Sequence, residues 1–220
     1  MDKANICMPI INTIKKLNSM GLGNKAVGSI SRRIDNDFIA ITPAEIDLRA
    51  LTMEDIVFVN IKNLACNDTL KPTKDYQLHA DIYMSRPNIS SILLGQSKNT
   101  CAAAKVTNEI PPILDDMAQI IGPTIRVANY ENAHCKKSIK NVIRALRGRY
   151  AALLADGGAI CLGRSLEETI VTWQVLEKSC IVYIESKKIG GAIPINRFIA
   201  YVMHHVYLRV YSKRREKKKV

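Results

Sequence analysis

Residues 153–168 of the chain read LLADGGAICLGRSLEE, and this stretch is the strongest local indication of the fold class. Residues 159–162 form a short apolar run between glycines, which is typical of a buried β-strand. Ser165 and Glu168 then have the capping-box spacing, in which a serine hydroxyl and a glutamate satisfy free backbone N–H groups at the start of a helix. We therefore expect a strand followed closely by a long helix.

The rest of the chain alternates between the same two kinds of element. Short β-branched stretches predict strands, and apolar residues that recur every three or four positions predict helices. The predicted strands cover residues 38–42, 56–61, 89–94 and 159–162. The predicted helices are one that ends near residue 20, others at 75–86, 113–121, 135–146 and 165–188, and a last one starting at Pro194. No internal repeat or low-complexity linker is visible, so we expect one α/β domain over residues 1–220, with a helical arm at 194–211 and a basic tail at 212–220.

The composition excludes several classes of protein. The chain has 220 residues, of which 47% are hydrophobic and 24% charged, which suits a packed globule and excludes an acidic disordered chain. No apolar stretch approaches the ~20 residues of a membrane-spanning helix. The net charge is +12, and residues 213–219, with six bases and one acid, carry 6 − 1 = +5 of it. A charge run at a terminus is usually a solvated tail, although it can also contact nucleic acid or an anionic lipid surface.

The six cysteines are spread along the chain with no C-x-x-C pair and no histidine at zinc-finger spacing. This spacing disfavours both a disulfide framework and a structural zinc site. The early apolar stretch at residues 6–11 is interrupted by Pro9, so it does not predict a secretory signal. We expect buried, reduced cysteines and a cytoplasmic protein.

Four stretches, taken in order, carry a family resemblance. They are GSISRR at 28–33 with ITPA at 41–44 and LTMEDIVFV at 51–59; PTKDYQLH at 72–79 with IY at 82–83 and RP at 86–87; ILLGQS at 92–97; and LLADGG at 153–158 with GRSLEE at 163–168 and LE at 176–177. In this order they resemble the class II aldolase and adducin-head family over nearly the whole chain. The resemblance implies an α/β fold of three layers, an α/β/α sandwich around a central sheet.

The resemblance also implies where a metal would bind. Family members cleave or rearrange sugar phosphates with a divalent metal, zinc, that three histidines hold and that stabilises an enediolate. Those ligand positions align with Leu94, Gln96 and Gly157. Leucine and glycine side chains offer no donor atom, and an amide oxygen is a poor partner for zinc. We therefore expect no metal at these positions and no zinc cofactor.

Four histidines remain from which a relocated metal site could be built: His79, His134, His204 and His205. His79 aligns with a family histidine on the helix after the carboxylate, where a packed or hydrogen-bonded role is commoner than a metal ligand. His204 and His205 are neighbours on a predicted helix, so their side chains diverge by about 100° and do not easily face one ion.

The resemblance assigns roles to the other pocket residues. Asp75 aligns with the catalytic carboxylate, and Tyr130 aligns with a tyrosine that serves as an acid in some members. The candidate substrate-binding residues are Ser29, which aligns with a phosphate-binding asparagine, Thr73 and Lys74, which align with two serines, and Gln96. Each has a plainer alternative that stays open: Asp75 and Thr73 can serve the start of a helix, Lys74 can be solvated, and Tyr130 can be a packed side chain with its hydroxyl satisfied.

The leading functional hypothesis is a degenerate, metal-free member of this family that acts as an oligomeric binding or scaffold protein, alone or with an active relative. The resemblance implies a homo-oligomer, a cyclic tetramer with pockets between subunits, and the final helix would lie across a neighbour. The alternative is a sugar-phosphate aldolase or epimerase of the fuculose- or rhamnulose-phosphate class, with a site rebuilt from Asp75, Gln96, Tyr130 and Lys74. Nucleic-acid binding is disfavoured because no aromatic residues interleave the basic ones and no binding motif is recognisable.

Overall fold

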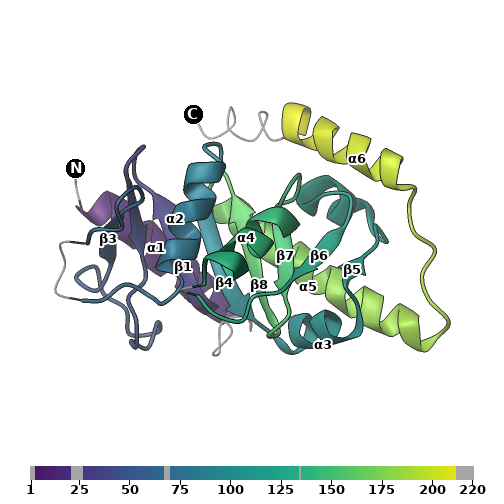
Figure 1. Cartoon of the computed structure of the whole chain (residues 1–220), viewed down its shortest axis with the longest axis horizontal. Helices are drawn as coiled ribbons and strands as arrows, with labels where there is room; N and C mark the ends of the chain where they lie inside the picture. The colour runs from purple at the N-terminus through teal and green to yellow at the C-terminus, as the bar shows by residue number, and fades with distance from the viewer. Residues whose placement is uncertain (1–2, 21–26, 67–69, 134, 212–220) are drawn as a thin grey trace.

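The structure is a computed structural model that describes residues 3–20, 27–66, 70–133 and 135–211 (Figure 1). The strands are β1 (Val27–Arg33), β2 (Phe38–Ile41), β3 (Val57–Asn60), β4 (Ser91–Gln96), β5 (Glu109–Ile110), β6 (Ile125–Ala128), β7 (Ala151–Leu154) and β8 (Gly158–Gly163). The helices are α1 (Lys3–Ser19), α2 (Tyr76–Ser85), α3 (Lys98–Val106), α4 (Lys136–Ala145), α5 (Leu166–Lys188) and α6 (Arg197–Val206), with π-helical turns η1 (Met117–Ile121) and η2 (Tyr207–Tyr211). The predicted tail and His134 lie outside the described residues.

The strands form one mixed sheet with helices on both faces. Its order is β3-β2-β1-β4-β8-β7-β6-β5, with β6 and β7 parallel and the other neighbouring pairs antiparallel. The helices α1, α3 and α5 pack on one face, and α2 and α4 pack on the other. The predicted three-layer α/β/α sandwich is therefore confirmed.

The alternation of side chains along the central strands builds both faces of the core. Along β8, Cys161 packs with the α1, α3 and α5 side, whereas Ile160 and Leu162 pack with the α2 and α4 side. The same alternation holds along β7, where Leu153 and Leu154 point to opposite faces. Successive strand residues point to opposite sides of a sheet, so a strand covered by helices on both faces needs apolar residues at every position.

The capping pattern after residue 162 is confirmed in part. The Ser165 hydroxyl accepts a hydrogen bond from Glu168 N at 3.2 Å, and α5 begins at the next residue. The Glu168 carboxylate accepts instead from Arg164 N at 3.0 Å and pairs with the Arg164 guanidinium at 2.7 Å. The second half of the box is thus replaced by an ion pair one residue earlier in the chain.

Most predicted elements occur within a few residues of their expected bounds, but some elements were missed. The strands β1, β5, β6 and β7 and the helix α3 were not predicted, and the helix expected at 113–121 is largely the short η1 turn. The helix α3 had a recognisable start, since Ser97 and Thr100 form a capping box with reciprocal hydrogen bonds. The motif at residues 28–33, noted only for its resemblance, is the strand β1.

The prediction that the last helix starts at Pro194 was wrong. It begins at Arg197, and Asn196 caps it by accepting hydrogen bonds from the backbone N–H groups of Phe198 and Ile199. An asparagine oxygen satisfies free N–H groups at a helix start, whereas proline only tolerates that position. The arm is therefore α6 followed by η2, from residue 197 to residue 211.

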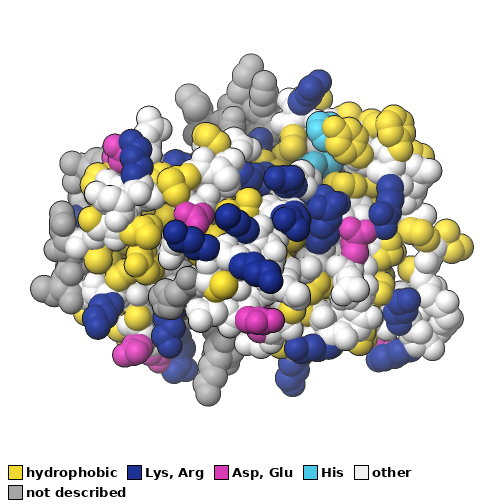
Figure 2. Space-filling view, in the orientation of Figure 1, with side chains coloured by type: hydrophobic (Ala, Val, Ile, Leu, Met, Phe, Trp, Pro, Cys, Tyr) yellow, Lys and Arg dark blue, Asp and Glu magenta, His cyan; other side chains and the backbone are white. Residues whose placement is uncertain are grey.

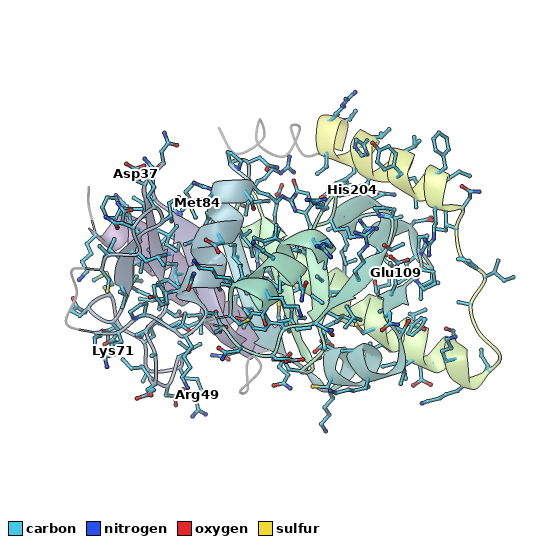
Figure 3. The ribbon with its side chains drawn as sticks, in the orientation of Figure 1. Asp37, Arg49, Lys71, Met84, Glu109 and His204 are labelled. Carbon is cyan, nitrogen blue, oxygen red and sulfur yellow. The ribbon has the colours of Figure 1, made fainter. Side chains whose placement is uncertain are left out.

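Polar contacts attach the arm to the sheet edge and to η1. The Arg197 guanidinium pairs with Glu109 at 2.6 Å, and Ile195 N donates to Pro112 O at 2.7 Å. Farther along the helix, the buried His204 places Nδ1 2.7 Å from Gln119 O (Figure 3).

None of the helices in the described ranges is long and apolar enough to cross a membrane.

Candidate functional site

The residues aligned with the family's acid and base are brought together by the fold. Asp75 immediately precedes α2, and Tyr130 lies two residues after β6. The Tyr130 hydroxyl donates a hydrogen bond of 2.6 Å to Asp75 Oδ1. Tyr130 is buried, whereas Asp75 is partly exposed. The pair therefore joins a buried phenol to a carboxylate that solvent can reach.

The surroundings of Tyr130 keep its hydroxyl protonated. Burial raises the pKa of Tyr130 far above its usual value, and the Asp75 carboxylate raises it further through its hydrogen bond and its charge. The charge of Asp156, in the turn between β7 and β8, acts in the same direction on this pKa. A phenol held in this state is a hydrogen-bond donor. The effect of Asp156 on its pKa means that the turn after β7 lies within electrostatic range of Tyr130.

The three positions aligned with metal ligands occupy the adjoining strand ends. Leu94 lies on β4 and is half-buried, Gln96 ends the same strand and is exposed, and Gly157 lies in the turn before β8. Gln96 pairs with Gly158 across the sheet, so all three positions share one end of the β4–β8 pair. The three aligned positions therefore lie close together, as the positions of a ligand set must.

A cysteine fills the space at the third ligand position. Cys101 Sγ lies 3.0 Å from Gln96 Nε2, which donates to it, and 3.3 Å from Gly157 O. A Cβ atom at position 157 would lie 2.9 Å from that sulfur, closer than normal contact allows. Gly157 also has φ +106°, a conformation that side chains of L-residues rarely adopt. The backbone conformation and the position of Cys101 therefore leave no room for a side chain at residue 157.

These residues do not fit the zinc of the family. Zinc sites use imidazole, thiolate or carboxylate donors, and of the three aligned side chains only Gln96 has a donor atom. Within the ranges that the structure describes, no group of three or more His, Cys, Asp or Glu side chains is placed to hold a metal ion. His79, His204 and His205 are accordingly not assembled into a relocated site by the described part of the fold.

Ser29 and His79 belong to a buried network. The Ser29 hydroxyl lies 3.0 Å from His79 Nε2, and the Ser31 hydroxyl lies 2.7 Å from Nδ1 of the same ring and 2.9 Å from the Tyr83 hydroxyl. Ser29, Ser31 and His79 have no exposed surface. Burial lowers the pKa of His79 to about 3, so the ring is neutral at ordinary pH. Ser29 is therefore occupied inside the fold rather than presented to a ligand.

The other candidate binding residues are divided between interior and surface. Thr73 is buried, and its backbone N–H donates to Thr42 O, whereas Lys74 and Gln96 are exposed. Asp75 makes no side-chain cap on α2. The open alternative that Asp75 serves the helix start is thus less well supported than its contact with Tyr130.

Sequence reasoning missed a buried carboxylate beside this site. Glu177 on α5 is buried, accepts a hydrogen bond from the Ser97 hydroxyl, and accepts another from Asn99 Nδ2 at 2.9 Å. These contacts fix the start of α3, from which Cys101 reaches Gly157. The LE step at 176–177 carries part of the family resemblance, but it gave no indication that the Glu177 carboxylate is buried against Ser97 and Asn99.

Comparison with known proteins agrees with this arrangement. Residues 9–184 match the sequence profile of the family described as Class II Aldolase and Adducin N-terminal domain. The L-fuculose phosphate aldolase of Escherichia coli K12 is 26% identical over 195 residues, which cover 89% of this chain and 90% of the relative. The 5-methylthioribulose-1-phosphate/5-deoxyribulose-1-phosphate aldolase of Rhodospirillum rubrum is 27% identical over 161 residues, covering 73% of this chain and 72% of the relative.

A solved structure shows the same fold. The structure of an L-fuculose 1-phosphate aldolase superposes with a TM-score of 0.86 at 23% identity, and covers 93% of this chain and 96% of its own. At that identity the likeness establishes the arrangement of helices and strands rather than the chemistry of the site.

Proposed function

The chain belongs to the Class II Aldolase and Adducin N-terminal domain family, and on that premise we propose that it is a metal-free binding or scaffold member. The observation that carries this proposal is the state of the three ligand positions. Leu94 has no donor atom, and Cys101 occupies the space into which a side chain at position 157 would project. None of the three positions carries an imidazole, and at Gly157 there is also no space for one.

A phosphorylated or otherwise anionic ligand is the chemistry best suited to what remains of the pocket. Lys74 offers an exposed ammonium group, Gln96 offers an exposed amide, and the Tyr130–Asp75 pair lies beside the neighbouring turn. The Ser29 hydroxyl is excluded from this set because it is hydrogen-bonded to His79 in the interior. The proposal includes a cytoplasmic location, in keeping with six cysteines that form no disulfide with one another. The expectation that the cysteines are buried holds for Cys7, Cys161 and Cys180, but it was wrong for Cys66, which is exposed, and for Cys101 and Cys135, which are half-buried.

A second candidate function is favoured by a different observation. The two curated relatives described above are named as sugar-phosphate aldolases, and the Tyr130–Asp75 pair has the groups needed for proton transfer. In this alternative Asp75 takes the proton of a substrate hydroxyl as the adjoining carbon–carbon bond breaks, and Tyr130 gives its proton to the enediolate that is left. Asp75 then returns its proton to the phenolate across their hydrogen bond, so both groups end as they began. Each such group contributes roughly 10²–10⁴-fold to a rate, so a rebuilt lyase would depend heavily on both.

The two candidates differ in a direct assay. We expect the purified chain to contain no stoichiometric zinc and to cleave L-fuculose 1-phosphate at no more than the background rate, with or without a chelator, because no described donor set would hold the metal. Elemental analysis and an aldehyde-release assay measure the two quantities. The L-fuculose phosphate aldolase of Escherichia coli serves as the positive control for the aldehyde-release assay.

Two outcomes would support the lyase instead. One zinc per chain with turnover that a chelator abolishes would mean that the metal is held by residues assigned here to packing. Turnover that resists the chelator but falls at least about a hundredfold in both Asp75→Asn and Tyr130→Phe would mean that the acid–base pair alone has been kept.

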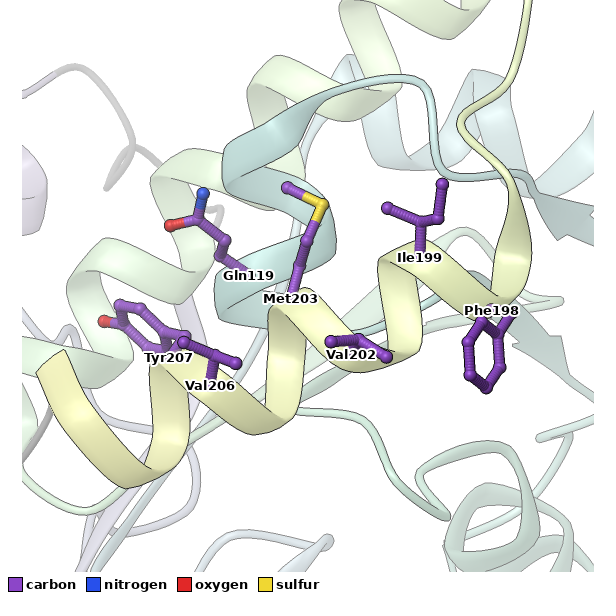
Figure 4. A pocket seen from close by; sticks show the side chains of 7 residues that line it. All are labelled: Gln119, Phe198, Ile199, Val202, Met203, Val206 and Tyr207. Atoms are coloured by element: carbon purple, nitrogen blue, oxygen red, sulfur yellow. The ribbon is translucent and has the colours of Figure 1, made fainter.

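We also propose that the chain assembles with copies of itself, as a tetramer. The outer face of α6 exposes Phe198, Ile199, Val202 and Val206, each by 43–73% of its surface. They border a groove of about 480 Å³ between α6 and η1, lined by Gln119, Phe198, Ile199, Val202, Met203, Val206 and Tyr207 (Figure 4). Exposed apolar surface of this kind is typical of an interface between subunits.

The α6 face provides a test of assembly. The double variant Ile199→Asp, Val202→Asp is expected to convert the oligomer to monomers at micromolar concentration, because it places two charges in a desolvated contact. Val106→Asp is the matched control, since Val106 is 63% exposed at the end of α3, away from α6. Sedimentation velocity measures the result. A native chain that sediments as a monomer, or a control that dissociates equally, would contradict the proposal.

A further inference from the structure

The exposed side of α4 carries a concentration of positive charge. Lys136, Lys137, Lys140 and Arg144 lie on the helix and Arg147 follows it, and all five side chains are exposed. The helix contains no acidic residue. Its apolar residues Ile139, Val142 and Ala145 are buried against the sheet and α2. Figure 2 shows Lys and Arg side chains gathered over the region where Figure 1 draws α4. We call these five residues the α4 basic face.

This charge is not neutralised by ion pairs within the chain. Among the residues that the structure describes, none of the five takes part in an ion pair. Asp81 on α2 lies near enough to feel one of them, since burial raises the pKa of Asp81 and the charge of Lys136 lowers it. A single partly buried carboxylate leaves most of the positive charge of the face uncompensated.

The arrangement also costs the helix stability. Lys136 and Lys137 occupy the first turn, where the helix dipole disfavours cations. Lys136, Lys140 and Arg144 follow one another at four-residue spacing, and like charges at that spacing destabilise a helix. These basic residues therefore do not stabilise α4. An anion bound across them would reduce both the unfavourable interaction with the helix dipole and the repulsion between the like charges.

A groove with further hydrogen-bond donors continues the face. It lies between α4 and β6, has a volume of about 460 Å³, and contains Asn108, Arg126, Asn129, Asn141 and Arg144 among its lining residues. Asn141 Nδ2 donates to Asn129 O at 3.2 Å, and Arg126 Nη1 donates to Arg144 O at 3.4 Å. Arg126 is paired with Glu109 at 3.4 Å, so Arg144, which belongs to both groove and face, is the guanidinium that extends the donor surface from the helix toward the groove's asparagine amides.

We propose that the α4 basic face binds the phosphate backbone of a nucleic-acid duplex without sequence preference. A row of unpaired cations on a rigid helix suits a regular line of phosphates, whose affinity for protein comes chiefly from the release of bound counterions. The face includes no aromatic side chain on which an unpaired base could stack, which favours a duplex over a single strand. Its apolar residues are buried in the core, so it offers nothing to insert into a lipid bilayer.

This inference revises the expectation drawn from the sequence alone. The absence of interleaved aromatics disfavours stacking on single strands, but backbone binding to a duplex does not need them. The sequence drew attention to the charge run at residues 213–219, whereas the structure shows that Lys136, Lys140 and Arg144 are exposed and have no ion-pair partner among the described residues. The inference is independent of the function proposed for the Asp75–Tyr130 site.

The test compares two variants of the full chain with the same loss of charge. The first is Lys136→Gln, Lys140→Gln, Arg144→Gln on α4. The matched control is Lys3→Gln, Lys15→Gln, Lys16→Gln, whose lysines are exposed on α1, on the opposite face of the sheet. Fluorescence anisotropy measures binding to a labelled 20-base-pair DNA duplex, and to an RNA duplex of the same sequence, between 50 and 200 mM KCl.

The native chain is expected to show a slope of log K against log salt of about −4.5 if all five cations contact phosphates, which is a loss of roughly 500-fold over this range. The α4 variant is expected to lose about three contacts, so its slope becomes shallower by about 2.7, and the control keeps the native slope. The ratio of the two affinities shows whether the face prefers a DNA or an RNA duplex. Thermal melting checks that both variants are folded, and Lys137→Gln, Arg147→Gln provides a second variant of the same face.

Three results would overturn the proposal. One is a slope of log K against log salt that is unchanged in both α4 variants. Another is a slope that becomes equally shallow in the α1 control, which would mean that only the net charge of the chain matters. The third is binding to vesicles that contain phosphatidylserine that falls in the α4 variants while duplex binding does not. That outcome would assign the face to an anionic membrane surface.

Discussion

The combined variant Leu94→His, Gln96→His, Gly157→His, Cys101→Ala is expected to bind one zinc ion per chain, at least about a hundredfold more tightly than the control Leu94→His, Gln96→His, Cys101→Ala, because a third imidazole completes the ligand set. Cys101→Ala serves two purposes. It removes the sulfur that would lie 2.9 Å from a Cβ atom at position 157, and it removes a thiolate that would itself bind zinc.

The backbone at position 157 sets the cost of this reconstruction. Its φ of +106° strains any side chain, by about 1–3 kcal/mol for a residue held in such a region. Apparent zinc-binding energies of about 10–16 kcal/mol in structural sites far exceed this strain. Isothermal titration with zinc, together with denaturation of the apo and zinc-loaded forms, measures both quantities. A combined variant that folds but binds no more zinc than the two-histidine control would show that these three positions do not form a ligand set.

Acidification from pH 6.5 to pH 5 is expected to lower the free energy of unfolding by about 2 kcal/mol through His79 alone. Burial lowers the pKa of His79 in the folded chain to about 3. In the unfolded chain the imidazole takes up a proton near pH 6.5, whereas in the folded chain it takes one up only near pH 3. Between pH 6.5 and pH 3 the unfolded state therefore binds more protons than the folded state. The stability that His79 contributes is present above pH 6.5 and is lost as the pH falls, at about 1.4 kcal/mol per pH unit.

His204 is expected to act with the same sign. Burial lowers its pKa to about 4, although its hydrogen bond with Gln119 O raises it in part. The two rings together would cost about 3 kcal/mol over this interval, which lies above the range where most carboxylates titrate. Urea denaturation at pH 6.5, 6.0, 5.5 and 5.0 measures the slope. His79→Gln is expected to reduce it by about one proton, whereas Ile82→Val, a destabilising control without a titrating group, should leave it as in the native chain.

A slope that is the same in His79→Gln and in the native chain would contradict this prediction. It would mean that the Ser29 and Ser31 hydroxyls stabilise the charged ring, and that burial does not dominate its titration. The experiment therefore also tests whether Ser29 is a fixed partner of His79 or is available to a ligand.

The pocket could be predicted from the sequence only in its composition. The loss of donors at Leu94 and Gly157 follows from residue type, because no packing can supply a donor atom to an alkyl side chain. The aligned roles of Asp75 and Tyr130 did not say whether the two side chains meet, since 55 residues separate them. The burial of Ser29, its contact with His79 and the approach of Cys101 to Gly157 depend on segments that converge only in the folded chain.

What the sequence by itself determined is local. The strand at 159–162 and the serine cap at Ser165 follow from side-chain periodicity and from hydrogen bonds that span a few residues, and the three-layer class follows from the order of the family motifs. The tertiary structure alone decided that Tyr130 donates to Asp75, that α6 docks on η1, and that the basic side of α4 is exposed with no ion-pair partner among the described residues. Contacts between distant segments depend on how helices and strands pack across the sheet, and a neighbour in space that is remote in sequence leaves no periodic mark on the chain.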